Sequence, residues 1–453
     1  MIGRVLAVAT LTLRGAVRSR ALFGLAVLLL FLMIGLPMTV KGSGSPASDV
    51  NVLLYYTLGC AWAVIMVATL LLSCAGISRD IEQEKIRLVA VKPVRKTEIW
   101  LGKWFGVLAM NAVLLVFVGV TVSGLLSWKI RSWDPATKKR LRQTVLVANR
   151  TIPHRPDDIG EDLERMYEIE LDSIKEHGRE TSAFQRKRIR GSIRHALLTA
   201  YSQVSPGNGK AWQIDIPRAA KVGEPMALHI NFSPLSGEIR SERGSWSLSA
   251  GSDSELVIED RIVAGMGNRI PLPDDFVSRG QTLSVRFENA TGGSSVVFDP
   301  EAAIELRIRE SSFARNLFFS LLVIFCQLAL LSAFGLAAGT FFSFPVATFV
   351  ATVLVFLSMT GHYFVVSEKS DVLSPVGVQP REQSVFHAVG ETLVLGLERI
   401  SGPALRLNSL VKLSNGLLVS LGSVFHAMLV VIGYSAVLTF ISCIYLSRRE
   451  LAA

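Results

Sequence analysis

Cysteine is scarce in this sequence, and its longest polar segment has none. Only four cysteines occur among 453 residues, and none lies between residues 75 and 325. The polar segment 129–315 therefore cannot contain a disulfide or a thiolate metal site. A hydrophobic core and hydrogen bonds must stabilise whatever fold this segment adopts.

The sequence also lacks the motifs of common catalytic sites. It has no GxxxxGK[ST] phosphate-binding loop, because "PGNGKAW" at 206–212 lacks both the first glycine and the final Ser or Thr. It has neither an HExxH zinc motif nor a GxSxG nucleophile motif. These absences predict a chain that is not an enzyme and that holds no metal, cofactor or ATP itself.

Long apolar stretches are what the sequence has instead. Half of its residues are hydrophobic, and six stretches reach the roughly 20 residues that a membrane-crossing helix needs. None of the six has Asp, Glu, Lys or Arg in its interior, as the hydrocarbon core requires. The predicted transmembrane helices are Ala21–Val40, Val52–Ile77, Trp104–Leu126, Asn316–Ala338, Val346–Val366 and Leu421–Tyr445. The first three occupy 21–128 and the last three 316–453.

The distribution of charge predicts the orientation. Eight of the ten excess positive charges lie in three short segments: residues 1–20 contribute +4, residues 78–103 contribute +3 and residues 448–450 contribute +1. Short loops rich in Lys and Arg mark the cytoplasmic side of a membrane. We therefore expect a multi-pass protein of the cell (inner) membrane with both termini in the cytoplasm. The positive charge then reflects membrane topology and contact with lipid, and it does not predict a nucleic-acid partner.

The segment 129–315 falls on the outer side in this topology and shows two patterns. Apolar residues recur at helical spacing within 135–205, which predicts a helical hairpin. From 211 to 310 the period changes to two, as in "MALHINF", "TLSVRFE" and "AIELRIR". Such runs, separated by Gly, Pro, Asp and Ser, predict an antiparallel β-sandwich. The fold class is therefore an α-helical polytopic membrane protein with a large extracytoplasmic α+β insertion.

Two further segments have amphipathic character. Residues 1–20 combine four arginines with spaced apolar residues, which predicts a helix lying at the inner membrane interface. Residues 367–420 are rich in leucine, with breaks at Gly and Pro, and predict short interfacial or re-entrant helices on the outer side. Within the fourth span, Gly335 and Gly339 are four residues apart and predict a close helix approach. Gln327 lies mid-span, where an amide is costly unless it bonds another helix or lines a polar pathway.

The cytoplasmic segment 78–103 has a composition that orientation alone does not require. It carries seven basic residues and also four acidic ones, three of them grouped before its centre. A short charged helix ending before Pro93 would present an acidic end first, as expected of a surface that docks another protein. A solvated loop is the simpler alternative.

The same segment resembles the loop between the second and third spans of ABC-2 type transporter permeases. The "D-x-E", "kP-v-R" and "lGK-w-G" elements of that family correspond to "DIE" at 80–82, "KPVR" at 92–95 and "LGKWFG" at 101–106. "GTFFSFPVA" (339–347) and "YLSRREL" (445–451) resemble the family's fourth-to-fifth span turn and its C-terminal end. The outer insertion departs from the family pattern.

The resemblance implies a function for the whole chain. It implies a six-helix permease subunit with an elbow helix at 1–20, which pairs with a second permease subunit and exports a substrate. A separate cytoplasmic ABC ATPase would bind ATP and seat the coupling segment. The ATPase-coupling residues would be Asp80, Glu82, Glu84, Lys85, Arg87, Lys92, Pro93 and Arg95.

Two alternatives stay open at this point. In one, the ATPase moves the outer domain, which acts on an extracytoplasmic partner without any transport. In the other, the chain is a surface-binding or receptor protein that the spans only anchor. Neither the substrate nor the choice between a homodimer and a heterodimer follows from the sequence.

Overall fold

A computed structural model describes most of the chain. The described residues are 2–18, 21–39, 46–82, 95–176, 183–217, 226–234, 241–250, 254–263, 268–273, 276, 280–290, 295–299, 303–356 and 409–451. Of the predicted outer segment 367–420, residues 367–408 therefore lie outside the described part of the chain. Residues 83–94, the centre of the predicted coupling segment 78–103, also lie outside it. The chain divides into two compact units, one holding the apolar helices and the other spanning Asn149–Glu310.

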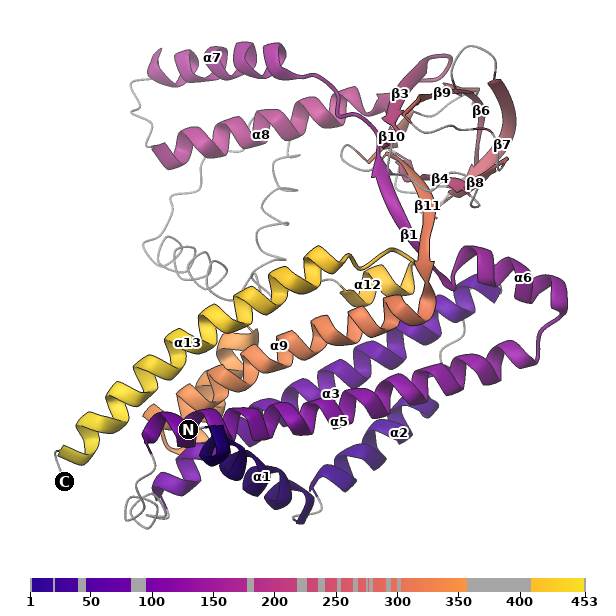
Figure 1. Cartoon of the computed structure of the whole chain (residues 1–453). Helices are drawn as coiled ribbons and strands as arrows, with labels where there is room; N and C mark the ends of the chain where they lie inside the picture. The colour runs from indigo at the N-terminus through magenta and orange to yellow at the C-terminus, as the bar shows by residue number, and fades with distance from the viewer. Residues whose placement is uncertain are drawn as a thin grey trace. The chain divides into compact units, whose positions relative to one another are not determined.

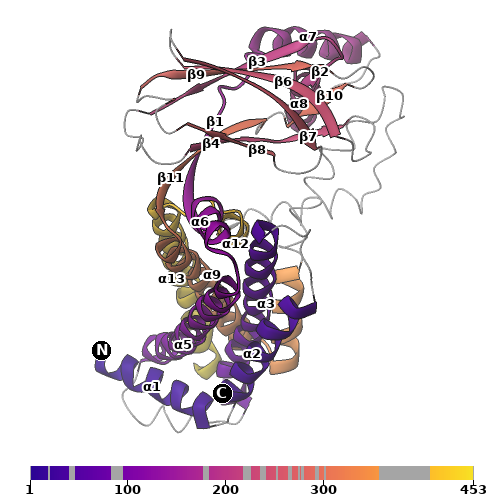
Figure 2. The same ribbon diagram turned by 90° about the vertical axis from the view of Figure 1, so that its right-hand side faces the viewer.

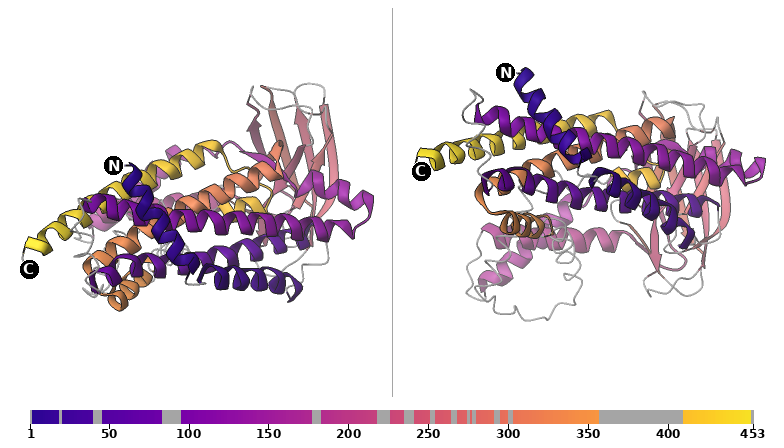
Figure 3. Two further views of the ribbon diagram at one scale, coloured as in Figure 1. Left: turned by 60° about the horizontal axis from the view of Figure 1, so that its bottom comes forward. Right: turned by 90° about the horizontal axis from the view of Figure 1, so that it is seen from below.

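The first unit is a bundle of long apolar helices (Figures 1 and 3). Five described helices are long and apolar enough to cross a membrane. They match five of the six predicted spans, and this is the architecture of a polytopic membrane protein. The bundle consists of α1 (Ile2–Arg18), α2 (Ala21–Thr39), α3 (Pro46–Glu82), α5 (Lys96–Arg131), α6 (Pro135–Thr144), α9 (Phe313–Phe341), a helix at Phe344–Phe356, α12 (Ser409–Ser414) and α13 (Leu421–Leu451).

The predicted fifth span, Val346–Val366, corresponds in its described part to the helix Phe344–Phe356. That helix is apolar but shorter than a bilayer requires, and residues 357–366 lie outside the described part of the chain. Six spans therefore stay a prediction, of which five are confirmed as helices of sufficient length.

Helix α9 is the central element of the bundle. About two thirds of its apolar stretch (67%) is buried, compared with 11% for α2 and 22% for α13. It packs against α3, α5 and α13. The large apolar side chains exposed on α2 and α13 suit helices that face lipid, which is as apolar as they are.

Helices α3 and α5 extend beyond what a membrane needs. With 37 residues, α3 is about 55 Å long at ~1.5 Å per residue, compared with a hydrocarbon core of about 30 Å. The end of α3 near Glu82 and the start of α5 near Lys96 can therefore lie outside the hydrocarbon. Charged residues gather at these ends, where water can reach them.

The second unit contains a β-sandwich and a helical hairpin (Figure 2). One sheet has the order β1-β11-β4-β8, another has the order β3-β9-β6-β7, and a short three-stranded sheet has the order β2-β10-β5. The strands are β1 (Val147–Pro153), β2 (Gln203–Val204), β3 (Gly209–Asp215), β4 (Met226–Ile230), β5 (Phe232–Pro234), β6 (Ser241–Ala250), β7 (Ser254–Val263), β8 (Asn268–Leu272), β9 (Thr282–Asn289), β10 (Val296–Phe298) and β11 (Ile304–Ser312). The hairpin helices are α7 (Gly160–Glu176) and α8 (Ala183–Tyr201).

The sandwich core confirms the alternating pattern of the sequence. The inward residues of "MALHINF", "TLSVRFE" and "AIELRIR" are all buried in one cluster. Aromatic side chains fill its centre: the ring centroids of Trp246 and Phe287 are 4.6 Å apart, and those of Trp212 and Phe298 are 4.8 Å apart. The strand pairs with known register are all antiparallel. An antiparallel sandwich was the predicted architecture.

The structure differs from the predicted boundaries of the outer domain 129–315 in three places. Residues 135–205 were expected to be helical, but 147–153 form the edge strand β1. Helix α6 belongs to the first unit, because Leu141 and Val145 are buried in the apolar cluster of the membrane helices. The second unit accordingly begins near residue 149, and its sheets include β1 and β2, which precede the predicted start of the sandwich at residue 211.

Candidate functional site

The candidate site lies where α3 ends and α5 begins. The backbone N–H of Arg95 donates to the carboxylate of Glu98 at 3.0 Å, which closes the first turn of α5. Glu98 is almost fully buried and lies 3.7 Å from the guanidinium of Arg4 on α1. The chain therefore enters α5 at a fixed point that α1 also contacts.

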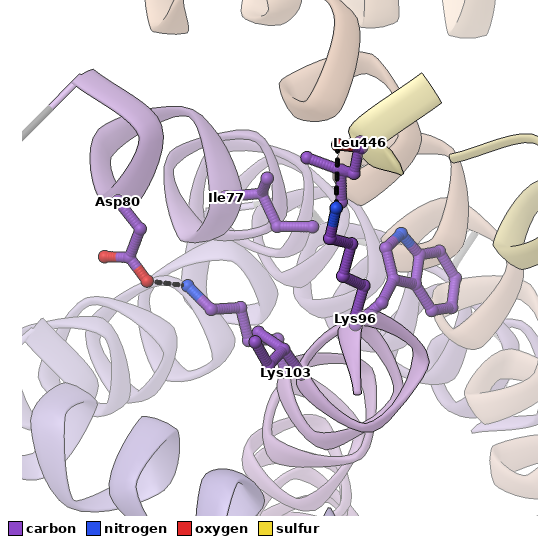
Figure 4. Close-up of a pocket in the computed structure, with 7 residues that line it drawn as sticks. Ile77, Asp80, Lys96, Lys103 and Leu446 are labelled. Atoms are coloured by element: carbon purple, nitrogen blue, oxygen red, sulfur yellow. Dashed lines mark hydrogen bonds and ion pairs between the residues drawn. The ribbon is translucent and has the colours of Figure 1, made fainter. Parts of the chain in front are cut away.

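An ion pair joins the ends of α3 and α5 (Figure 4). The ammonium group of Lys103 donates to the carboxylate of Asp80 and to the carbonyl oxygen of Gly76, so one side chain holds two groups of α3. The Lys103 side chain is 12% exposed and that of Asp80 is 35% exposed. Because an ammonium this poorly solvated needs its partners, the contact fixes how the two helices lie at this end.

Lysine 96 makes a second contact from the start of α5. Its ammonium group donates to the carbonyl oxygen of Leu446 near the end of α13, at 3.1 Å (Figure 4). Lys96 and Lys103 are seven residues apart, so they lie on the same face of α5. Between them is a small cavity of about 30 Å³, lined by Ile77, Asp80, Lys96, Ile99, Trp100, Lys103 and Leu446.

The turn that follows α9 reaches the same place. The backbone N–H of Phe344 donates to the carboxylate of Glu82 at 3.0 Å, and the guanidinium of Arg79 lies 4.8 Å from the centre of the Phe344 ring. A carboxylate at the first residue of the helix Phe344–Phe356 also suits the positive end of that helix dipole. The ring of Phe341 lies 4.6 Å from that of Tyr445 on α13.

The segments 79–106, 339–347 and 445–451 thus meet at one end of the bundle. The first segment contacts the second through Glu82 and Phe344, and it contacts the third through Lys96 and Leu446. More than 200 residues of sequence separate the first segment from the other two.

The predicted coupling residues are only partly described. Asp80, Glu82 and Arg95 are placed as above, while Glu84, Lys85, Arg87, Lys92 and Pro93 lie outside the described residues. The structure gives Asp80 and Glu82 partners within the chain. These two carboxylates therefore hold α3 to its neighbours.

Sequence reasoning did not single out Lys96, Glu98 or Lys103 as site residues. Lys103 lies within the "LGKWFG" part of the resemblance, and its spacing of seven from Lys96 was the available signal. Glu98 was recognisable as a carboxylate three residues after the start of a helix. The partners of all three residues depend on how the helices pack, which the sequence does not reveal.

Close packing connects this site to the rest of the bundle. A Cβ atom on Gly339 would lie 2.5 Å from the carbonyl oxygen of Cys74, and one on Gly335 would lie 2.7 Å from the Cβ of Ser73, so α9 and α3 touch at both glycines. Glycines Gly102 and Gly106 of α5 give the same close approach to α1, where an added Cβ would lie within 2.6 Å of a side chain.

Polar side chains also join the helices in the middle of the bundle. The indole N–H of Trp62 on α3 donates to the amide oxygen of Gln327 on α9 at 3.1 Å. The hydroxyl of Thr69 on α3 donates to the amide oxygen of Asn111 on α5 at 2.9 Å. Gln327 therefore bonds another helix, and its part in any polar pathway stays a prediction.

The described residues contain no group of three or more His, Cys, Asp or Glu side chains arranged to hold a metal ion. No protein-family model matches this sequence, and no curated protein is significantly similar to it.

Proposed function

We propose that this chain is the membrane subunit of an ABC-2 type transporter, driven by a separate cytoplasmic ATPase and exporting a substrate across the cell membrane. The observation that supports this most strongly is the meeting of three separate segments at the α3–α5 junction. Each of them resembles a part of such permeases, and hydrogen bonds from Glu82 and Lys96 link them. A chain that used its spans only as an anchor would not need this junction.

The contacts suggest how movement would pass from the ATPase to the spans. Residues 83–94 connect the last residue of α3 to Arg95 at the start of α5, and Asp80 and Lys103 tie these two ends together. A displacement of 83–94 would therefore move α3 and α5 as a pair. Helix α3 touches α9 at Gly335 and Gly339, so the central helix would follow. Alternating access requires such joint movement of several helices.

Within this proposal the coupling residues have two different tasks. Asp80, Glu82 and Arg95 hold the ends of the segment through contacts inside the chain. The residues between Glu82 and Arg95 would contact the ATPase, and Glu84, Lys85 and Arg87 are the principal candidates. Lys92 and Pro93 would set the direction of the return into α5.

The proposal includes further partners. A second permease subunit, identical or not, would complete the transporter, and the ATPase subunit would bind the ATP. The orientation with both termini in the cytoplasm follows from the charge distribution.

The test is purification of the tagged full-length chain from its native membranes. We expect an ABC ATPase to purify with it, and we expect the Glu84→Lys/Arg87→Glu variant to lose that ATPase at an equal membrane level. Bringing like charges together in an interface costs several kcal/mol. A matched control is Glu168→Lys on the exposed face of α7, which should leave the ATPase bound. A wild-type chain that brings down no ATPase would contradict the proposal.

One observation favours movement of the outer domain without transport as a second candidate. Strand β11 ends at Ser312 and α9 begins at Phe313, so no loop separates the sandwich from the central helix. Under this candidate, a movement of α9 would be passed on through this direct chain connection. Inserting five Gly and Ser residues between Ser312 and Phe313 would separate the candidates. The insertion should abolish the cellular function under the second candidate and leave export intact under the first.

A further inference from the structure

A polar cavity lies at one end of the sandwich and has no role in the function proposed above. Its volume is about 410 Å³, within the range of ligand sites. It is lined by the end of α8, by β2, by the start of β3 and by one residue before α7; these are Asp157, Tyr201, Gln203, Val204, Ser205, Asn208, Gly209, Lys210 and Ala211. All of them belong to the second unit.

The charged groups of the cavity are held in place. The ammonium group of Lys210 donates to Asp157 and to the carbonyl oxygen of Tyr201, both at 2.6 Å, and it lies 5.5 Å from the centre of the buried Trp212 ring. The hydroxyl of Tyr201 donates to Asp162 at 2.5 Å. A ligand would therefore meet polar groups that are already oriented, which lowers the entropic cost of binding.

A tight turn fixes the wall between β2 and β3. The N–H of Asn208 donates to the carbonyl oxygen of Ser205 at 3.0 Å, and Gly207 between them has a φ of +76°. With Pro206 at the second position, this is the pattern of a type II turn. The left-handed φ favours glycine, so "SPGN" is a sequence suited to this conformation.

Strand β3 is an edge strand, and its hydrogen-bond register shows which groups face outward. In its sheet it pairs with β9 alone. The backbone groups of Asn208 and Ile216 point towards β9. The carbonyl oxygen of Asn208 accepts from the N–H of Asn289, while the N–H of Ile216 donates to Gln281 and its carbonyl oxygen accepts from Gly280. In an antiparallel ladder the intervening odd-numbered residues direct their N–H and C=O groups the other way. The carbonyl of Gln213 does so, since it accepts from the N–H of Arg155 at 2.7 Å.

By the same register, the N–H and C=O groups of Gly209 and Ala211 point away from β9. Both residues line the cavity. They are two residues apart, which is the repeat of an extended chain. The side chain of Ala211 is small and exposed. The cavity therefore gives access to a short stretch of strand edge that an incoming backbone can pair with.

The surroundings of the cavity are acidic. Within the lining, the carboxylate of Asp157 pairs with the ammonium of Lys210, and two further carboxylates, Asp158 and Asp162, lie near Tyr201. The pKa of the Tyr201 hydroxyl is raised, chiefly by its hydrogen bond to Asp162 and also by the negative charges of Asp162, Asp157 and Asp158. A ligand with a positive group would be favoured over one with a negative group.

We propose that this cavity binds an extended polypeptide segment of a partner protein, which pairs with the edge of β3 at Gly209 and Ala211 and places a Lys or Arg side chain beside Asp157. Backbone pairing would supply affinity, and the basic side chain would supply selectivity. This proposal does not depend on transport or on the ATPase.

The test uses the full-length chain in lipid nanodiscs and fluorescence anisotropy of labelled heptapeptides. The first peptide is Thr-Val-Thr-Lys-Thr-Val-Thr, the second has Glu in place of Lys, and the third is the Lys peptide with N-methyl groups on alternate peptide nitrogens. We expect the Lys peptide to bind tightest. The N-methylated peptide should bind about fivefold or more weakly, because a backbone hydrogen bond contributes about 1 kcal/mol net.

Two variants at one position provide a matched comparison. Ala211→Pro removes the outward N–H without removing a bond to β9, so the sheet should persist. It should weaken the Lys peptide about fivefold or more. Ala211→Thr retains that N–H and should bind like the wild type. Asp157→Asn should reduce the preference for Lys over Glu.

Three results would overturn the proposal. One is equal binding of the Lys peptide and its N-methylated copy by the wild-type protein. Another is equal binding of the Lys peptide by Ala211→Pro and Ala211→Thr. The third is saturable binding of maltotriose without peptide binding, because this would make the cavity a carbohydrate site.

Discussion

The ion pair between Asp80 and Lys103 is the contact whose removal should be most informative. We consider Asp80→Asn, Lys103→Gln and the double variant. A pair between exposed residues contributes about 0.2–1 kcal/mol, while removing one partner of a buried pair costs about 3–5 kcal/mol. With exposures of 35% and 12%, this pair lies between the two limits. In Asp80→Asn, Lys103 also keeps the carbonyl of Gly76 as a partner. We therefore expect a coupling energy of about 1–2 kcal/mol.

The assay is a double-mutant cycle, with unfolding of the detergent-solubilised chain titrated by a denaturing detergent. The matched control is the pair of Asp49 and Lys129, which joins the same two helices at their opposite ends with 3.8 Å between the charged atoms. Its coupling energy should stay below about 0.5 kcal/mol.

The same variants have a functional readout. Under the proposed function, Asp80→Asn should lower the stimulation of an associated ATPase, because α3 and α5 would no longer move together, whereas Asp49→Asn should leave it unchanged. The reasoning is refuted if the Asp80–Lys103 coupling energy is no larger than that of the control pair. It is also refuted if both single variants at this junction stimulate the ATPase normally.

Three further predictions follow from packing, titration and topology. Gly339→Ala should destabilise the bundle by about 1–3 kcal/mol, because the added Cβ would meet the carbonyl oxygen of Cys74. The control Gly124→Ala, whose added Cβ would have no atom within 4 Å, should leave the stability unchanged, and denaturation of both variants measures the difference. Burial lowers the pKa of His229 to about 4, so its neutral form stabilises the second unit above the unfolded pKa near 6.5. That stability should fall by about 1–3 kcal/mol between pH 6.5 and 4. His229→Gln should flatten this dependence in thermal unfolding scans, and an unchanged slope would contradict it. In a cysteine-free background of intact cells, Ser447→Cys should resist an impermeant thiol reagent and Glu168→Cys should react; the reverse pattern would invert the topology.

The apolar helices could be predicted well because their signal is local. A run of about 20 residues without charge has few other possible structures, so α2, α3, α5, α9 and α13 were all expected. The alternating strands β4, β9 and β11 were equally readable, since a buried face imposes period two. Gly335 and Gly339 were expected at a close approach, and both pack on α3.

The parts of the fold and of the candidate site that the sequence did not predict depend on tertiary contacts. Strand β1 has only seven residues and gains its partner from β11, more than 150 positions later, so its own sequence reads ambiguously. Helix α6 is polar overall, and only Leu141 and Val145 reveal that it packs on the membrane helices. At the candidate site the charged residues were visible in sequence, but Asp80 could not be assigned to Lys103, nor Glu82 to the N–H of Phe344. Those pairings follow from how helices distant in sequence meet.

The most direct test of the account is photocrosslinking from the coupling segment in living cells. Benzoylphenylalanine placed at Arg87 should form an adduct whose second component is an ABC ATPase, and the same group at Glu168 should form none. The result that would contradict the account is a chain at its normal membrane level that forms no ATPase adduct from position 87, or that forms it equally well from position 168.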